Sequence, residues 1–148
     1  MATATKPTFE TTLEVRDACL CLHVQRAARA LARRFNEALR PMGLTNGQFS
    51  LMMSLNRPEP PDMGAVASLL GVDRTTLTAA LKPLERRGLV KIMVGPEDRR
   101  SRIMMLTAKG RKVLAGAVPI WRKTHAAVEA LLPDGDPDQF RKNLRAMG

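Results

Sequence analysis

The chain has 148 residues, with 24 lysines and arginines against 14 aspartates and glutamates, and a formal net charge of +10 at pH 7. This excess of cations favours a polyanionic partner, nucleic acid first and an anionic membrane surface second. No apolar run approaches the roughly 18 to 20 residues that cross a bilayer, and residues 1–10 lack the apolar centre of a signal peptide, so we expect a cytoplasmic protein without a membrane partner.

Residues 1–44 are expected to hold a polar arm and a long helix. The arm covers residues 1 to about 11, and apolar residues then recur every three or four positions from about Leu13 to Leu39, which predicts one uninterrupted helix. At ~1.5 Å per residue this helix would be roughly 40 Å long, too long for a small lobe to cover. Its four arginines are interpreted as solvated charges without a role in DNA binding: Arg26, Arg29, Arg33 and Arg34.

Two cysteines and a histidine, Cys19, Cys21 and His23, fall within this predicted helix. Side chains two positions apart on a helix point to nearly opposite sides, so we do not expect the two thiols to pair. Buried, unreactive thiols are the first interpretation, and a redox-sensing Cys21 is the alternative. A metal site is disfavoured because only Cys19 and His23 would share a helix face, so no cofactor is expected.

Residues 45–107 are expected to form one lobe. Thr45 and Gln48 have the spacing of a capping box, and the helix that they start would bury Phe49, Met52 and Leu55. The proline-rich residues 56–61 predict a stiff, non-helical connector.

Residues 62–88 then have the pattern of a helix-turn-helix. Asp62 and Asp73 are candidate caps of two helices, and Gly71 between them permits a turn of three or four residues. The apolar residues at helical spacing predict the faces that the two helices bury: Val66, Ala67, Leu69 and Leu70 in the first, and Leu77, Ala80, Leu81 and Leu84 in the second. Pro83 predicts a bend in the second helix rather than its end.

The other face of the second helix carries hydroxyls and cations: Arg74, Thr75, Thr76, Thr78 and Lys82. Such side chains can enter a major groove and meet bases or phosphates. An ordinary solvated face is the alternative interpretation for an isolated helix.

Residues 89–94 and 102–106 are predicted strands, joined by a loop that starts with Gly95 and Pro96. Arg99, Arg100 and Arg102 lie in or beside the loop. A carboxylate at Asp98 could hold one guanidinium in a fixed fork, which would leave the tip rigid enough to insert into a minor groove. A solvated basic loop is the alternative.

Residues 108–148 are predicted to form a long helix capped by Thr107 and bent at Pro119, then a last helix that begins at Asp136-Pro137. The apolar faces at both ends of the chain exceed what the lobe can cover. We therefore expect them to pack together and against a second copy, as a homodimer that would present two helices to half-sites about one helical turn apart.

The segments GVDRTTLTAALKPLERRGLV and DRRSRIMMLTAKG resemble the recognition helix and wing of the MarR-family transcriptional regulators. The resemblance implies a mainly α fold with a small β-hairpin wing, in which a winged helix-turn-helix lobe hangs from long N- and C-terminal dimerisation helices. It also implies that Arg100 enters the minor groove of double-stranded DNA while Asp98 orients it.

Two kinds of effector follow from the same resemblance. Cys21 is similar in position to the reactive cysteine of the peroxide-sensing OhrR branch, although this chain has no tyrosine of the kind that branch uses near its cysteine. Many MarR-like proteins bind small, often aromatic anions between the dimerisation helices and the lobe. Here such a pocket would use residues from the set His23, Phe49, Met53, Trp121 and His125, for which the alternative is a place in the core.

Motifs of nucleophilic, metal-dependent and nucleotide-dependent enzymes are absent from the sequence, and no enzyme is expected. The sequence thus predicts a homodimeric, sequence-specific repressor of a pseudo-palindromic operator, relieved by a ligand or by oxidation. A winged-helix module that binds nucleic acid or protein without operator specificity is the alternative.

Overall fold

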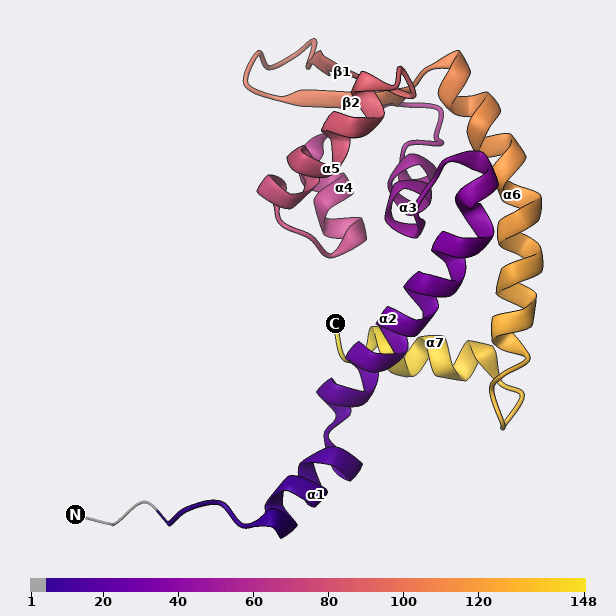
Figure 1. The fold of residues 1–148 in the computed structure, drawn as a ribbon. Helices are drawn as coiled ribbons and strands as arrows, with labels where there is room; N and C mark the ends of the chain where they lie inside the picture. Colours follow the sequence, from indigo (N-terminus) through magenta and orange to yellow (C-terminus); the bar gives the residue numbers. More distant parts are fainter. Residues whose placement is uncertain (1–4) are drawn as a thin grey trace.

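A computed structural model describes residues 5–148 and confirms the expected mainly helical fold with one two-stranded hairpin. Figure 1 shows a lobe that carries the hairpin, and two long helices, Leu20–Leu39 and Ala108–Glu129, that pack against each other beside the lobe and diverge away from it. The elements in chain order are α1 (Phe9–Ala18), α2 (Leu20–Leu39), the short 3-10 helix η1 (Arg40–Met42), α3 (Asn46–Ser54), α4 (Met63–Leu70), α5 (Arg74–Arg86), β1 (Val90–Val94), β2 (Arg102–Leu106), α6 (Ala108–Glu129) and α7 (Pro137–Arg145).

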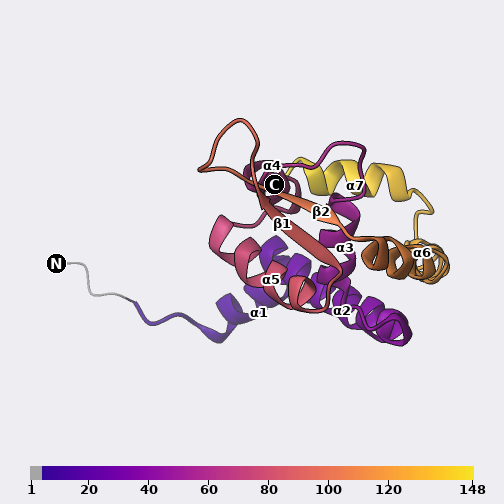
Figure 2. The same cartoon turned by 90° about the horizontal axis from the view of Figure 1, so that it is seen from above.

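The core lies where the lobe meets the ends of α2 and α6. Its buried side chains are all apolar among the residues that the structure describes. They come from α2 (Leu39), α3 (Phe49, Leu51, Met52), α4 (Val66, Ala67), α5 (Leu77, Leu81, Leu84), the strands (Val90, Met104, Leu106) and α6 (Leu114, Ala117), with Leu44, Leu55 and Leu89 between elements. Seen from above in Figure 2, α6 is viewed nearly along its axis, and α5 lies beside the hairpin, which it contacts through β1.

Helix starts agree closely with the sequence-based predictions. The side chains of five residues accept a backbone N–H at the first turn of their helices, namely Thr45, Asp62, Asp73, Thr107 and Asp136. Thr45 and Gln48 form the complete capping box. Both α5 and α6 continue past their internal prolines, Pro83 and Pro119, so the prediction that α5 does not end there is confirmed.

The N-terminal helix differs from its prediction in two ways. It begins at Phe9 instead of about Leu13, and it is interrupted at Cys19, whose ψ of 107° is extended. Cys19 ends α1, because its N–H still bonds to the Val15 carbonyl, and it begins α2, because its Sγ accepts the Leu22 N–H at 3.5 Å. A thiol thus acts as a helix cap, a role that periodicity cannot reveal.

Three burial predictions were also wrong. Leu69 is 69% exposed, because Val66 and Ala67 are the residues by which α4 packs into the core. Ala80 is exposed on α5. Cys21 is exposed and Cys19 only partly buried, so these thiols are not the buried pair that was expected.

No helix in residues 5–148 is both long enough and apolar enough to span a membrane.

The contrast between Leu81 and Leu69 gives a test of this packing. Leu81→Ala would empty a site that is 0% exposed and is expected to lower the free energy of unfolding by about 2–5 kcal/mol. Leu69→Ala removes the same atoms from a solvated position and should change it by no more than about 0.5 kcal/mol. Urea denaturation at one protein concentration measures both, and equal losses would contradict the orientation of α4.

Candidate nucleic-acid interface

The turn between α4 and α5 sets the angle of the second helix. Gly71 ends α4 in the left-handed region with φ of 67°, which a glycine adopts without steric penalty. Two residues later Asp73 starts α5, and its carboxylate accepts the Thr76 N–H at 2.7 Å. That backbone hydrogen bond is the main reason why the pKa of Asp73 is lowered. The cap therefore stays ionised at neutral pH and is lost only as the pH falls through this lowered value.

Burial of Leu77, Leu81 and Leu84 fixes which face of α5 points outward. The opposite face is formed by residues spaced at i, i+4, i+7 and i+11, all of them exposed: Thr75, Ala79, Lys82 and Arg86. Thr75 and Lys82 were predicted to lie here. Arg86 was missed, although the same helical spacing could have identified it.

The remaining predicted residues of α5 sit at the edge of this face or bond internally. The Thr78 hydroxyl donates to the Arg74 carbonyl at 2.8 Å and lies 3.8 Å from the Met63 sulfur. Thr76 is bound to the Asp73 cap. Thr75 is thus the hydroxyl on α5 for which the described residues provide no hydrogen-bond partner.

The hairpin is attached to the start of α4 as well as to the core. Val90 to Val94 pair antiparallel with Leu106 to Arg102. The Met104 N–H also donates to the Pro61 carbonyl at 3.3 Å, and Asp62 forms an isolated bridge with Ile103. The end of the connector therefore pairs with the free edge of β2. This pairing joins the hairpin to the start of α4.

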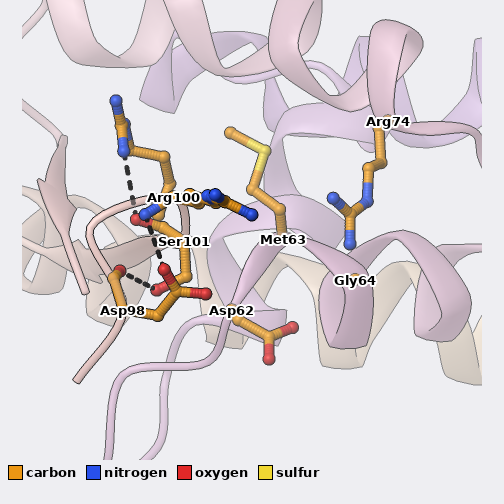
Figure 3. Close-up of a pocket in the computed structure, with 8 residues that line it drawn as sticks. Asp62, Met63, Gly64, Arg74, Asp98, Arg100 and Ser101 are labelled. Carbon is orange, nitrogen blue, oxygen red and sulfur yellow. Dashed lines mark hydrogen bonds between the residues drawn. The ribbon is translucent and has the colours of Figure 1, made fainter. Parts of the chain in front are cut away.

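The loop at the tip of the hairpin is organised by Asp98, though differently from the prediction. Its Oδ1 accepts the backbone N–H of Arg100 at 2.9 Å, and its carbonyl accepts both the N–H and the hydroxyl of Ser101. Figure 3 shows the bonds that the Arg100 N–H and the Ser101 hydroxyl donate to Asp98. The predicted fork between Asp98 and a guanidinium is absent from the described ion pairs, because the carboxylate is used to fold the backbone as in an Asx-turn.

This loop is tight at Gly95, where a Cβ would stand 1.9 Å from the Ser101 hydroxyl and would displace it from its bond to the Asp98 carbonyl. The three arginines then have different roles. Arg102 braces the loop, since its Nη1 donates to the carbonyls of Arg99 and Ser101 at 3.0 and 3.1 Å. Arg99 and Arg100 are exposed, and no side-chain hydrogen bond is described for either of them.

A cleft of about 300 Å³ separates the hairpin loop from the two helices. One wall is the loop, with Arg100, Arg102 and Asp98, and the other is the start of α4 with Arg74 from α5. Figure 3 shows the Arg74 guanidinium directed toward Gly64, in the first turn of α4. Three guanidinium groups, of Arg74, Arg100 and Arg102, line this cleft together with the carboxylates of Asp62 and Asp98. The N-terminus of α4 adds partial positive charge, and the excess of cations suits a phosphate.

Polar bonds hold the far end of α5. Arg87, its C-cap, donates from Nη1 to the Gly43 carbonyl at 2.8 Å, just after the end of α2. Lys109, near the start of α6, donates to the Arg87 carbonyl at 2.9 Å. The C-terminal end of α5 is therefore linked to the start of α6 and to the turn after η1, which follows α2.

The residues predicted for an effector site do not form one pocket. Phe49, Trp121 and His125 stack in sequence, with ring centroids 6.1 and 4.6 Å apart, while His23 faces a separate hollow on α2. An apolar cavity of about 440 Å³ lies between α2, α6 and α7, with His125, Glu129 and Arg141 among its lining residues. No cluster of three metal-binding side chains occurs in the part of the chain that the structure describes.

A helix-turn-helix followed by a hairpin, with a basic cleft between them, defines a winged-helix protein. Residues 44–101 match the sequence profile of the MarR family, and the transcriptional regulator HosA of Escherichia coli O111:H- is 30% identical over 104 residues, which span 70% of this chain and 77% of HosA. The chain belongs to the MarR family of transcriptional regulators. The matched segments cover from 55% to 77% of three curated relatives.

Two solved structures with bound DNA have the same fold. The transcriptional regulator MosR of M. tuberculosis, in complex with DNA, is 41% identical with a TM-score of 0.80, and the match covers 87% of this chain and 92% of MosR. The transcriptional repressor CouR, bound to a 23-mer duplex, is 32% identical with a TM-score of 0.79, and the match covers 90% of this chain and 94% of CouR.

The role of Asp98 can be tested without DNA. Asp98→Asn keeps an oxygen that can accept the Arg100 N–H, whereas Asp98→Ala removes it. We expect faster hydrogen exchange at the Arg100 amide in Asp98→Ala and near-native exchange in Asp98→Asn, measured by NMR. Equally fast exchange in both variants would mean that the carboxylate charge, not the acceptor geometry, orders the loop.

Proposed function

We propose that the protein is a homodimeric, sequence-specific repressor that binds a pseudo-palindromic operator in double-stranded DNA. The carrying observation is the cleft in which the hairpin loop and the start of the helix-turn-helix present arginines to the same space. Residues 45–107 are the DNA-binding lobe of this proposal, and residues 1–44 and 108–148 supply the dimer contacts. Repression is supported by the description of CouR as a repressor.

In this proposal α5 enters the major groove. Thr75, Lys82 and Arg86 on its outward face meet base edges or phosphates there. Arg74 and the first turn of α4 hold a backbone phosphate, which fixes the register of the lobe without reading sequence. Thr76 and Thr78 act indirectly by ordering the first turns of α5.

The hairpin is the wing that reaches the minor groove. Arg100 is the inserted cation and Arg99 a second contact to the sugar-phosphate backbone, because both are exposed on an ordered loop. Asp98 and Arg102 shape that loop from within. A narrow minor groove concentrates negative potential, which favours a guanidinium over a neutral side chain.

The homodimer is supported by apolar side chains left exposed on the terminal helices. Phe9 and Leu20 at one end and Leu131, Phe140 and Leu144 at the other are all solvent-accessible in the single chain. Contact through these residues would join two lobes by a twofold axis and present two α5 helices to successive major grooves.

We also propose that a signal relieves DNA binding, either oxidation at Cys21 or a small aromatic or anionic ligand. Cys21 is exposed, and Gln25 Nε2 lies 3.4 Å from its sulfur. Trp121 is stacked between Phe49 of the lobe and His125, so a ligand bound beside it would disturb the lobe. His23, exposed on α2, is the other candidate contact for such a ligand. Operator affinity measured with and without peroxide, in the native protein and in Cys21→Ser, tests the first route.

The alternative function is DNA binding without operator specificity, driven by the net charge of +10. Salt titration and competition separate the two. A specific regulator should prefer its operator over random duplex by at least ~10³, whereas a simple polycation would show a steep salt dependence and little preference.

Arg100→Ala is expected to weaken operator binding by roughly 10- to 100-fold, equivalent to about 1–3 kcal/mol, because it removes the inserted guanidinium. Arg122→Ala, which removes an equal charge from an exposed position on α6, should leave the affinity within about threefold. Fluorescence anisotropy at fixed salt measures both. Equal losses in the two variants would mean that the wing acts only through net charge.

Thr75→Ala is expected to change base preference at one position of each half-site, because a hydroxyl on the outward face of α5 is lost. Thr78→Ala should instead weaken binding to all sequences alike, since its hydroxyl bonds to the helix backbone. Selection from a randomised half-site library compares them. An unchanged sequence profile in Thr75→Ala would make Thr75 a phosphate contact or a bystander.

A further inference from the structure

Helix α1 has no core of its own. None of its ten residues is buried, and Phe9 and Val15 are 73% and 51% exposed. In Figure 1 the helix lies beyond the end of α2 that is farthest from the lobe. Helices of this length are marginal in water without tertiary contacts, because nucleation is unfavourable. A stable α1 therefore requires a surface that covers it.

The acidic side chains of α1 are arranged in a row, and the one basic side chain of the helix, Arg16, pairs with Asp17 at its end, at 2.6 Å. Glu10, Glu14 and Asp17 follow one another at i, i+4 and i+7, so they share one face of the helix. We name these three residues the acidic row. Phe9 and Leu13, at i and i+4, form an apolar strip beside it. The helix thus offers an apolar strip and a line of carboxylates side by side.

A matching surface is present on α2. Arg26, Arg29 and Arg33, at i, i+3 and i+7, form an arginine row on one face. Together with His23, Ala27 and Ala30 they line a hollow of about 460 Å³. The small alanines lie next to the cations, as the apolar strip lies next to the carboxylates on α1. Each row spans seven positions, roughly 10 Å of helix.

The arginine row is uncompensated within the chain. Between residues 5 and 148 no ion pair or side-chain hydrogen bond joins Arg26, Arg29 or Arg33 to a carboxylate, and residues 20–36 contain no acid. Like charges at such spacings destabilise a helix. An anionic surface from outside the chain would offset this repulsion between the arginines. Solvent alone would leave the repulsion in place.

The acidic row cannot reach the arginine row of its own chain while both helices are intact. Cys19 is the single residue between α1 and α2, whereas two helices that fold back on each other need a connection of about two to five residues. The two rows can therefore meet only between chains.

We propose that the acidic row of α1 docks on the arginine row of α2 in a second copy of this chain, with Phe9 and Leu13 over Ala27 and Ala30. The contact rests on the proposed homodimer and specifies one part of its interface. A twofold axis produces it twice. Exposed ion pairs add little affinity singly, so the rows set register and orientation while the apolar strip supplies buried area.

Charge reversal tests the contact. The acid-reversed variant carries Glu10→Lys and Glu14→Lys, and the arginine-reversed variant carries Arg26→Glu and Arg29→Glu. Each alone is expected to raise the dimer dissociation constant at least about tenfold at physiological salt, as measured by analytical ultracentrifugation, because two like-charged rows then face each other. Glu59→Lys with Glu97→Lys, both exposed and in the lobe rather than in the terminal segments of the proposed dimer, is the control for net charge and should leave dimerisation within about threefold.

Mixing the two reversed variants separates contacts between chains from contacts within one. In a mixed dimer the lysines of one α1 face the glutamates of the other α2, and the native rows face each other in the second contact. Equimolar mixing should therefore restore dimers, labelled differently on the two chains, to near-native stability. Circular dichroism at 222 nm confirms that each variant is folded.

Each other outcome has a distinct meaning. Failure of the mixture to dimerise overturns the contact, and so does an acid-reversed variant as stable as the native dimer. A weakened arginine-reversed variant beside an unaffected acid-reversed one would also overturn it and assign the arginine row to a different anion. A native protein that is monomeric at micromolar concentration would instead remove the proposed homodimer itself.

Discussion

The buried leucine face of α5 is the constraint on which the interface depends. Leu77, Leu81 and Leu84 are almost fully inaccessible, and their burial leaves the helix a single rotational setting in the lobe. That setting turns Thr75, Lys82 and Arg86 outward together. The buried apolar face of α5 therefore determines which polar side chains are exposed, because the helix cannot rotate about its axis.

A second constraint joins the hairpin to this helix pair. The Pro61 carbonyl and the Asp62 bridge extend the hairpin by one short edge, and Asp62 also caps α4. Asp62 thus follows the connector, caps α4 and pairs with Ile103 of β2. The two walls of the cleft, which carry Arg74 and Arg100, are thus joined through Pro61 and Asp62.

Features set by neighbouring residues could be predicted from the sequence. Local side chains determine the caps at Asp73 and Thr107, the turn at Gly71 and the two strands. The family resemblance also rested on short continuous segments of the sequence. The break at Cys19 could not be predicted. It depends on the Cys19 thiol accepting the Leu22 N–H in place of a backbone carbonyl, and cysteine is not a residue expected to cap a helix. The fork expected at Asp98 was wrong: the carboxylate accepts the Arg100 backbone N–H, and no described ion pair joins it to a guanidinium. The exposure of Leu69 depends on how α4 packs against its neighbours. The spacing of apolar residues within one helix does not reveal that packing.

The hydrogen bonds of Arg87 to Gly43 and Lys109 hold the C-terminal end of α5. A change in the angle of this helix therefore moves its N-terminal end most. Its 13 residues place the opposite end about 20 Å away. A tilt of about 5° between the long helices would move that end by about 2 Å, more than half of the ~3.4 Å that separates successive base pairs. In the proposed complex with DNA, a small change in the angle between the long helices would therefore suffice to move α5 out of register with a base pair.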